Sequence, residues 1–240
     1  MSLDVQIWSD IACPWCYIGK RRFERALADF PQRDQVTVHW RSYQLDPSLP
    51  DHDHRSEVEY LVAAKGLPAH SVEGMISHVA EQAAGEGLEY DFDALVVANS
   101  RRAHRVLQAA KRADEADGAG RTDRLKEALL SAHFEGGLNI GDVEVLTDLA
   151  EAAGLTADQA RAAVGSDDLD DAVARDIAEA AAIGVRGVPF FVFDGKYGVS
   201  GAQPPEVFLQ ALEVSWAERT PALITIDGAT GEACGPDGCA

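Results

Sequence analysis

The amino-acid sequence predicts an α/β fold in which a long helical block interrupts a sheet. Three observations support this prediction: a strand–helix–strand pattern over residues 5–45, an almost wholly helical pattern over 56–165, and an apolar strand with a hairpin turn after residue 185. A chain of 240 residues is long enough to bury a core, as one large domain or as one domain with a sizeable insertion.

The first unit alternates apolar and polar side chains over residues 5–8 and then becomes helical. Phe23 and Leu27 recur at helical spacing, and we expect this helix to end near Phe30. β-Branched and aromatic residues over 35–45 then predict a second strand, which prolines close.

The central block is rich in Ala, Glu, Leu and Arg, with glycine-containing joins. Asp142 is expected to act as an N-cap or first-turn residue. His104 lies in the longest predicted helix, within the polar run 99–105. We expect it on a solvated face or as a structural histidine with satisfied hydrogen bonds, and a contribution of this polar face to a substrate groove is the alternative. The predicted helices lie near residues 57–64, 71–84, 93–116, 122–135 and 142–153.

A further helix over residues 169–183 is expected to end at Gly184. An apolar strand follows, and Asp194-Gly195 is a strong signal for a two-residue hairpin. An amphipathic helix over 207–212 closes the pattern.

A proline at the start of this apolar strand needs an explanation, because proline removes a ladder hydrogen bond. Either the Val188–Pro189 peptide bond is cis, or a trans Pro189 begins an edge strand. The residues alone leave both explanations open.

Residues 9–20 carry the main chemical signal. Cys13 and Cys16 form a C-x-x-C motif between the first strand and the first helix, with Pro14 early in the helix, where a missing N–H costs nothing. We expect the helix N-terminus to favour a Cys13 thiolate and Cys16 to be better shielded. The pair suits thiol–disulfide exchange, in which Cys13 attacks and Cys16 resolves the mixed disulfide. Half of a zinc site and a structural cysteine pair remain alternatives.

Charge and composition narrow the classes of partner and compartment. Forty acidic against 21 basic side chains give a formal charge of -19, which repels nucleic acid and anionic membranes. The chain has no run of 18 apolar residues and no signal-peptide pattern at its N-terminus, so we expect a cytoplasmic protein. Four cysteines in such a chain indicate catalysis, redox sensing or metal binding. His52 and His54 have no third ligand nearby and are expected to be solvated loop residues; no metal is predicted.

The order of these motifs resembles the DsbA-like branch of the thioredoxin superfamily. Cys13-Pro14-Trp15-Cys16, a helical insertion and the segment 187–192 follow one another in the same order, and the run 9–19 is most similar to cytosolic FrnE-like members. The resemblance covers about residues 4–217 and implies a thioredoxin fold, a four-stranded mixed sheet with a large helical insertion. The implied parts are a thioredoxin-like domain of residues 1–50 and 168–218, an inserted helical domain of 51–167 and a C-terminal tail of 219–240.

The resemblance also implies roles for residues around the dithiol. A cis Pro189 would pack beside the dithiol, and the backbone of Val188 would pair with an extended substrate segment. Pro14 and Trp15 complete the expected substrate-binding set. The best-known periplasmic members have a histidine between the cysteines, whereas Trp15 carries no positive charge. Extreme oxidising power is therefore not implied, and we expect reduction, isomerisation or repair of disulfides.

The C-terminal tail contains a second pair, Cys234 and Cys239, in a C-x4-C motif. The glycines and the proline between them allow a small disulfide loop to close. Some FrnE-like proteins resemble this chain in having such a motif, which suggests a redox relay to the first pair. A passive structural disulfide, an incidental dithiol and a four-cysteine zinc site remain alternatives.

The leading functional hypothesis is a thiol–disulfide oxidoreductase or isomerase that acts on protein or small-molecule disulfides. It needs no metal and no bound organic cofactor, and glutathione is a candidate redox partner. One alternative is a kappa-type glutathione-dependent isomerase or transferase, but those enzymes have a serine at the first active-site position, whereas this chain has Cys13. Another is a non-catalytic holdase or interaction module with an apolar groove around Trp15, Phe190 and Phe191.

Overall fold

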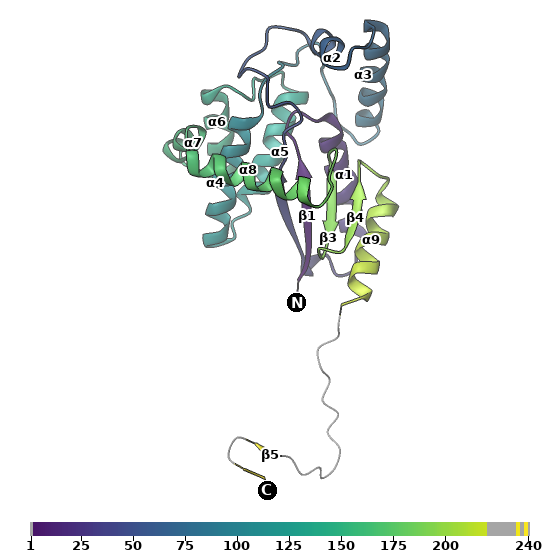
Figure 1. Cartoon of the computed structure of the whole chain (residues 1–240), viewed down its shortest axis with the longest axis vertical. Coiled ribbons are helices and arrows are strands. Elements are labelled where there is room, and N and C mark those ends of the chain that lie inside the picture. Colours follow the sequence, from purple (N-terminus) through teal and green to yellow (C-terminus); the bar gives the residue numbers. More distant parts are fainter. Residues whose placement is uncertain (1, 220–233, 236–237, 240) are drawn as a thin grey trace.

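The computed structural model describes residues 2–219, 234–235 and 238–239. A four-stranded sheet with the strand order β2-β1-β3-β4 forms its centre (Figure 1). Strand β1 runs parallel to β2 and antiparallel to β3, and β3 and β4 form an antiparallel hairpin. The predicted mixed four-stranded sheet is therefore confirmed. Its strands are β1 (Leu3–Ser9), β2 (Val36–Ser42), β3 (Phe190–Phe193) and β4 (Tyr197–Ser200).

Helices cover both faces of this sheet. On one face, α1 (Pro14–Asp29) and α9 (Pro205–Ala217) pack against each other, and their aromatic residues meet those of β3. The Phe191 and Phe208 ring centroids, for example, are 4.5 Å apart. On the other face, α8 (Asp167–Ala182) covers β1, where the Trp8 indole N–H donates a 2.9 Å hydrogen bond to a backbone carbonyl of α8. A short 3-10 turn, η1 (Arg33–Gln35), leads into β2.

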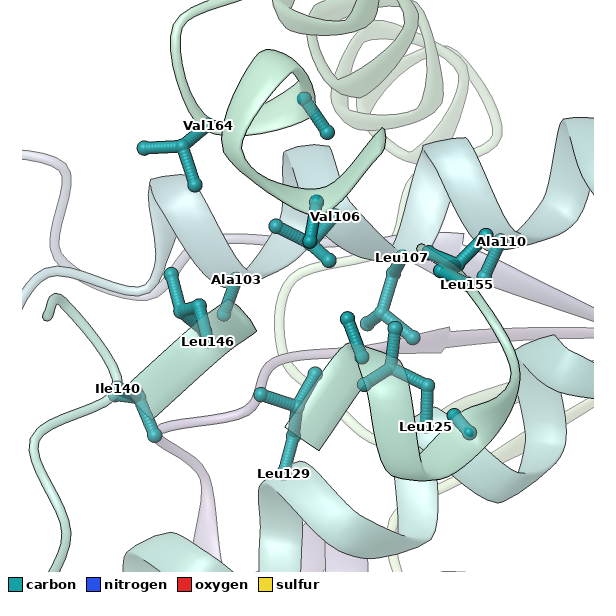
Figure 2. Close-up of a cluster of buried hydrophobic side chains, with 14 of the residues drawn as sticks. Ala103, Val106, Leu107, Ala110, Leu125, Leu129, Ile140, Leu146, Leu155 and Val164 are labelled. Carbon is teal, nitrogen blue, oxygen red and sulfur yellow. The ribbon is translucent and has the colours of Figure 1, made fainter. Parts of the chain in front are cut away.

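The helical bundle has a core of its own, which Figure 2 shows. Side chains at helical spacing on α4 face those of α5 and α6. Burying each leucine or valine fully stabilises the folded state by roughly 1.5–3 kcal/mol relative to leaving it exposed. Ile11, from the turn that carries the cysteines, is completely buried in this core. The bundle thus anchors the active-site turn. Its helices are α4 (Arg101–Asp117), α5 (Arg121–Phe134), α6 (Val143–Ala153), α7 (Ala157–Val164) and α8.

Two further helices, α2 (Glu57–Lys65) and α3 (Ala69–Ala84), lie at the top of Figure 1, near the end of the sheet where α1 begins. Every residue of α2 is at least partly exposed, whereas α3 buries Val72, Val79 and Ala83. A side chain–backbone capping box between Ser56 and Glu59 begins α2.

The structure corrects two predictions for the helical block. The helix expected over 93–116 begins only at Arg101, and α7 was not predicted. Residues before Arg101 bond instead to the loop after β2, because the Asp53 N–H donates to the Val97 carbonyl at 2.8 Å and the Asn99 N–H to the Pro50 carbonyl at 2.9 Å. The remaining predicted helices of the block begin and end within two residues of the observed ones.

Local turn and cap predictions are confirmed. Asp142 accepts hydrogen bonds from the backbone N–H groups of Glu144 and Val145, at 2.9 and 3.1 Å, and so caps α6. Asp194 and Gly195 both have positive φ, 47° and 66°, so the predicted turn lies at these residues. The hairpin connection is one residue longer than predicted, because Phe193 pairs with Tyr197 and residues 194–196 lie between the strands. Within the described residues, no helix is long and apolar enough to cross a membrane.

In the C-terminal tail, the short strands β5 (Cys234–Gly235) and β6 (Gly238–Cys239) pair antiparallel, with Cys234 opposite Cys239. The two cysteine side chains, and residues 220–233 before them, lie outside what the structure describes.

Candidate active site

The two cysteines lie where the C-x-x-C pattern predicts, at the N-terminus of α1. Cys13 is the N-cap residue, Pro14 occupies the first helical position, and the Cys16 N–H donates to the Cys13 carbonyl at 2.9 Å. Both are free thiols and both are buried, with 4 % of Cys13 and 1 % of Cys16 exposed. Cys16 is therefore the better-shielded sulfur, as predicted.

The segment before β3 meets Cys13 directly. The Val188–Pro189 peptide bond is cis, as one of the two open explanations held, and the Cys13 thiol donates a hydrogen bond to the Val188 carbonyl at 3.5 Å. Gly19 of α1 makes this approach possible, because a Cβ atom there would lie only 2.8 Å from the Pro189 ring. Residues 175 positions apart in the sequence thus form one surface.

Pro14 and Trp15 sit on the opposite flank of Cys13, against the segment before α4 and against α3. The Pro14 carbonyl accepts a 2.7 Å hydrogen bond from the Tyr90 hydroxyl. The Trp15 ring is partly buried, and its centroid lies 6.1 Å from that of His78.

A buried carboxylate lies beneath the active-site turn. Asp10 accepts hydrogen bonds from the backbone N–H groups of Ala12 and Leu45 and from the His104 ring, the last over 3.2 Å. Burial alone raises the pKa of Asp10, but the hydrogen bond and charge of His104, together with hydrogen bonds from Leu45 and Ser100, lower that pKa overall. His104 is buried, so the solvated-face alternative is wrong. The structural histidine is confirmed only in part, because Nε2 pairs with Asp10 whereas Nδ1 has no hydrogen-bond partner among the described residues.

A buried lysine, Lys126 of α5, lies behind the dithiol. Only 1 % of it is exposed, and no carboxylate in the described part of the chain lies within 4.0 Å of its ammonium nitrogen. The nitrogen lies 5.4 Å from the centroid of the Trp40 ring. Burial lowers the pKa of Lys126 to about 8.

The two thiols differ in acidity, and the order is the reverse of the sequence expectation. A hydrogen bond with Cys16, together with burial, raises the pKa of Cys13. Burial alone would also raise the pKa of Cys16, but the Cys13 thiol, the Lys126 charge and the Ser9 hydroxyl together lower it. The thiolate is thus favoured on Cys16, which the Cys13 thiol and then the buried Lys126 charge stabilise. Cys16 is placed to accept the Cys13 proton.

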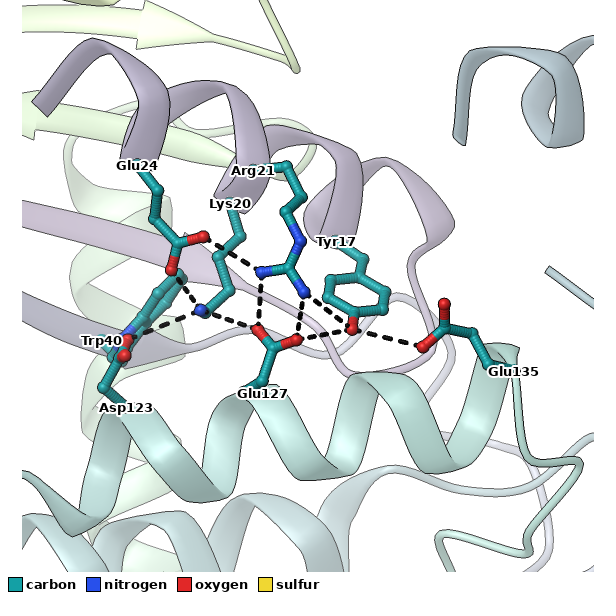
Figure 3. Close-up of polar contacts among 8 residues, drawn as sticks. All are labelled: Tyr17, Lys20, Arg21, Glu24, Trp40, Asp123, Glu127 and Glu135. Atoms are coloured by element: carbon teal, nitrogen blue, oxygen red, sulfur yellow. Dashed lines mark hydrogen bonds and ion pairs between the residues drawn. The ribbon is translucent and has the colours of Figure 1, made fainter. Parts of the chain in front are cut away.

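Ion pairs hold α5, and with it Lys126, against α1 (Figure 3). Glu127, the neighbour of Lys126, accepts from the Tyr17 hydroxyl at 2.6 Å and pairs with Arg21 and, at 2.8 Å, with Lys20. Lys20 is itself buried, so this network is screened far less than a surface one.

The sequence interpretation missed Lys126 and His133. Both lie on one stripe of α5 with Leu130, at spacings of four and three residues, and this stripe is buried. A polar residue on an otherwise apolar helical stripe was the available signal. It could not show which other element the stripe would face.

Two other pairs from the sequence, His52 with His54 and Cys234 with Cys239, are of residue types that serve as metal ligands or as redox partners. His52 and His54 are exposed, as expected, with ring centroids 4.7 Å apart. No group of three or more potential metal-binding side chains occurs among the residues that the structure describes. Cys234 and Cys239 cannot be related to Cys13, since their side chains lie outside the described part.

Comparison with known proteins finds relatives and solved structures that cover most of the chain. The crystal structure of a probable DsbA oxidoreductase from Streptomyces coelicolor is 45% identical and covers 99% of this chain and 98% of that chain, with a TM-score of 0.84. The cytosolic disulfide reductase DsbM from Pseudomonas aeruginosa, also solved with GSH, is 19% identical over 89% of this chain and 98% of that chain, with a TM-score of 0.63. The uncharacterized protein YwbO of Bacillus subtilis is 25% identical over 218 residues, 88% of this chain and 96% of that protein.

The family model of the DSBA-like thioredoxin domain matches residues 4–213, which include the sheet, the dithiol, the helical bundle and most of α9. The mixed sheet with its helical insertion is the fold that the sequence predicts. The chain therefore belongs to the DSBA-like thioredoxin domain family.

Proposed function

We propose that this protein is a thiol–disulfide oxidoreductase that exchanges disulfides through Cys13 and Cys16. The observation that carries the proposal is the dithiol at the N-terminus of α1, with the Cys13 sulfur 3.5 Å from the carbonyl before the cis proline. Membership of the DSBA-like family and 45% identity to a probable DsbA oxidoreductase support it.

In the proposed reaction the Cys13 proton, which the resting thiol directs to the Val188 carbonyl, passes to the neighbouring Cys16 thiolate, and the Cys13 sulfur attacks one sulfur of a substrate disulfide. A bond forms between the Cys13 sulfur and that substrate sulfur, and the other half of the substrate leaves as a thiolate. This thiolate takes the proton from Cys16, which then attacks Cys13 and expels the second half. Two electrons pass from the dithiol to the substrate, which ends as one thiol and one thiolate, and the thiolate takes its proton from water. The reverse sequence oxidises a dithiol substrate.

The surface around Cys13 supports roles for four neighbours. We propose that the Val188 backbone and Pro189 receive an extended substrate segment, since both lie beside the attacking sulfur. Pro14 and Trp15 would bound the substrate on the other flank. The proposal includes protein and small-molecule disulfides as substrates. It includes both their reduction and their isomerisation.

Several finer assignments belong to the same proposal. We assign the chain to the FrnE-like subgroup and to the cytoplasm, on the run of residues 9–19 and on its cysteine usage. The pairing of Cys234 opposite Cys239 supports closure of the tail loop, and we propose that this pair relays electrons to the first. We also propose that residues 51–167 form an inserted helical domain between the two parts of the thioredoxin-like domain, residues 1–50 and 168–218.

Trapping of the mixed disulfide tests the proposal. With Cys16→Ser, the attack by Cys13 on a disulfide substrate should stop at the covalent intermediate, which mass spectrometry would detect as an adduct on Cys13. Cys13→Ser should form no adduct and lose all exchange activity. Turnover that survives in Cys13→Ser would overturn the assigned roles.

A further inference from the structure

A cavity of about 450 Å³ adjoins Cys13, and we call it the Cys13 pocket. Its walls come from the active-site turn, the loop after β2, helices α2 and α3, and the segment before α4, with His133 of α5. Among the described residues that line it, none belongs to the 186–193 segment, so the pocket is separate from the surface around Val188. A disulfide held at Cys13 would therefore have different surroundings on its two sides.

Most of the Cys13 pocket is apolar. Leu61, Ile76, Val79 and Leu95 line its walls, and two large apolar side chains at its edge are unusually exposed. These are Leu45, which is 50% exposed, and Met75, which is 42% exposed. An apolar occupant would remove both from water, which is favourable.

The charges of the pocket disfavour an anion. Asp10 and Asp46 line it, together with Glu57, whose pKa burial raises to about 7, against the single amine of Lys65, and no arginine is among its described lining residues. A hydrogen bond from Ser48 lowers the pKa of Asp46, which keeps that carboxyl ionised at neutral pH. Bringing a further carboxylate into this partly desolvated site would place like charges together.

A neutral imidazole is among the groups that line the pocket. His133 is only 2 % exposed, and its Nδ1 has no hydrogen-bond partner among the residues that the structure describes. Burial lowers the pKa of His133 to about 4, so the ring is uncharged at neutral pH. An uncharged imidazole can pair with an amide or a hydroxyl without bringing charge into the site.

The volume of the pocket indicates the size of its occupant. Sites for small molecules typically measure about 300–1,000 Å³ and combine apolar walls with a few polar groups. We propose that the Cys13 pocket binds one half of a low-molecular-weight disulfide whose body is apolar, whose polar groups are neutral and which carries no carboxylate. This proposal rests on the disulfide exchange proposed above. Glutathione disulfide, with its several carboxylates, is a poor fit, in contrast to DsbM, which has been solved with GSH.

The chemistry of such a substrate balances without a further reactant. The half in the pocket forms a disulfide with Cys13 while the other half leaves as a thiol. Cys16 then displaces the bound half, so that one substrate disulfide and the protein dithiol become two small thiols and the Cys13–Cys16 disulfide. The substrate gains the two electrons that the dithiol loses.

Two disulfides that share the N-acetylcysteine unit but differ in charge and in apolar groups test the proposal directly. The disulfide of N-acetylcysteine carries carboxylates, whereas the disulfide of N-acetylcysteine benzylamide replaces them with neutral amides and apolar rings. Each rate of reaction with the reduced protein is divided by the rate with dithiothreitol, which removes differences in intrinsic reactivity. We expect a normalised kcat/KM at least about tenfold higher for the benzylamide, and glutathione disulfide should resemble the carboxylate compound.

A pair of variants ties the preference to the pocket. Met75→Glu adds a carboxylate at the edge of the pocket and should lower kcat/KM for the benzylamide by about tenfold. Leu67→Glu adds the same charge on the exposed join between α2 and α3, away from the pocket lining, and should leave the rate unchanged. Circular dichroism melts of both variants show whether each is folded.

The outcomes separate the two proposals. Equal normalised values for the two disulfides in the wild-type protein, or a faster reaction with glutathione disulfide, would overturn the pocket assignment and leave the oxidoreductase proposal standing. Absence of reaction with every disulfide would overturn both. Equal effects of Met75→Glu and Leu67→Glu would show that the preference arises from general charge rather than from the pocket.

Discussion

Replacing Lys126 by methionine should make the protein more stable. Burial holds the pKa of Lys126 near 8, against 10.5 for an unperturbed lysine. Each pKa unit corresponds to about 1.4 kcal/mol, so the charged form costs the folded state about 3 kcal/mol at neutral pH. Methionine has a similar length and no charge. We therefore expect the free energy of unfolding to rise by about 3 kcal/mol and Tm by about 6–12 °C.

The pH dependence of stability provides an independent test of the same cost. Because the pKa of Lys126 is lower in the folded state, the unfolded chain binds more protons between about pH 8 and 10.5. The stability of the wild-type protein should therefore rise with pH across this window. In Lys126→Met this contribution should be absent, which urea unfolding at a series of pH values would measure.

The same substitution should also change the pKa of Cys16 and the reduction potential of the dithiol. The Lys126 charge helps to lower the pKa of Cys16, so its removal should raise that pKa and destabilise the reduced dithiol. The reduction potential should then become more negative, by about 30 mV for each 1.4 kcal/mol of lost thiolate stabilisation. Thiolate absorbance against pH and a redox titration would measure the two effects.

Lys111→Met is the matched control. Lys111 lines the same small cavity as Lys126 and burial lowers its pKa too, but its charge acts on Asp176 and Arg41. Lys111→Met should raise the free energy of unfolding and leave the pKa of Cys16 unchanged. An unchanged Cys16 pKa in Lys126→Met, or a loss of stability there, would refute the reasoning.

Three further substitutions probe the surroundings of the dithiol. Burial raises the pKa of Glu57 to about 7, so the stability of the wild-type protein should fall as pH rises from about 4.5 through 7. The loss should be less than about 3 kcal/mol, because the side chain is partly exposed. Glu57→Gln should lose this pH dependence, which urea unfolding across that range would measure. His104→Ala removes the 3.2 Å partner of buried Asp10 and should lower the free energy of unfolding by about 3–5 kcal/mol, measured by urea unfolding. Gly19→Ala places a Cβ atom 2.8 Å from the Pro189 ring, so we expect a loss of about 1–3 kcal/mol in thermal melts and slower disulfide exchange.

Two of these substitutions have a control variant, and the third has a result that would contradict it. Glu59→Gln leaves Glu57 in place and should keep the pH dependence of the wild-type protein. If His104→Ala had the same free energy of unfolding as the wild-type protein, the buried Asp10 carboxylate would not need the histidine as a partner. Gly74→Ala, where an added Cβ meets nothing within 4 Å, should be neutral or stabilising, and an equally tolerant Gly19→Ala would argue against close packing at Pro189.

The sequence predicted the features that depend on nearby residues. The C-x-x-C at the start of a helix, the Asp142 cap and the Asp194-Gly195 turn each follow from the backbone chemistry of a few neighbouring positions. The mixed sheet and the cis Val188–Pro189 bond followed from the family resemblance, and the structure has both.

The sequence could not predict what depends on distant contacts. The start of α4 moved because the residues before it bond to the loop after β2, some 45 positions earlier. The thiolate is favoured on Cys16 because Lys126, 110 positions later, lies behind it, and no local pattern indicates that placement. The Cys13 pocket likewise combines five separate stretches of the chain with one histidine.

The redox equilibrium of Cys13 and Cys16 is the most direct test of the central claim. The purified protein would be equilibrated in buffers of reduced and oxidised dithiothreitol, its free thiols alkylated, and the modified cysteines located by mass spectrometry. We predict a single reversible two-electron transition in which Cys13 and Cys16 lose and regain reactivity together. If both cysteines stay fully alkylatable across the whole range of buffers, the protein is not a dithiol oxidoreductase of the kind proposed.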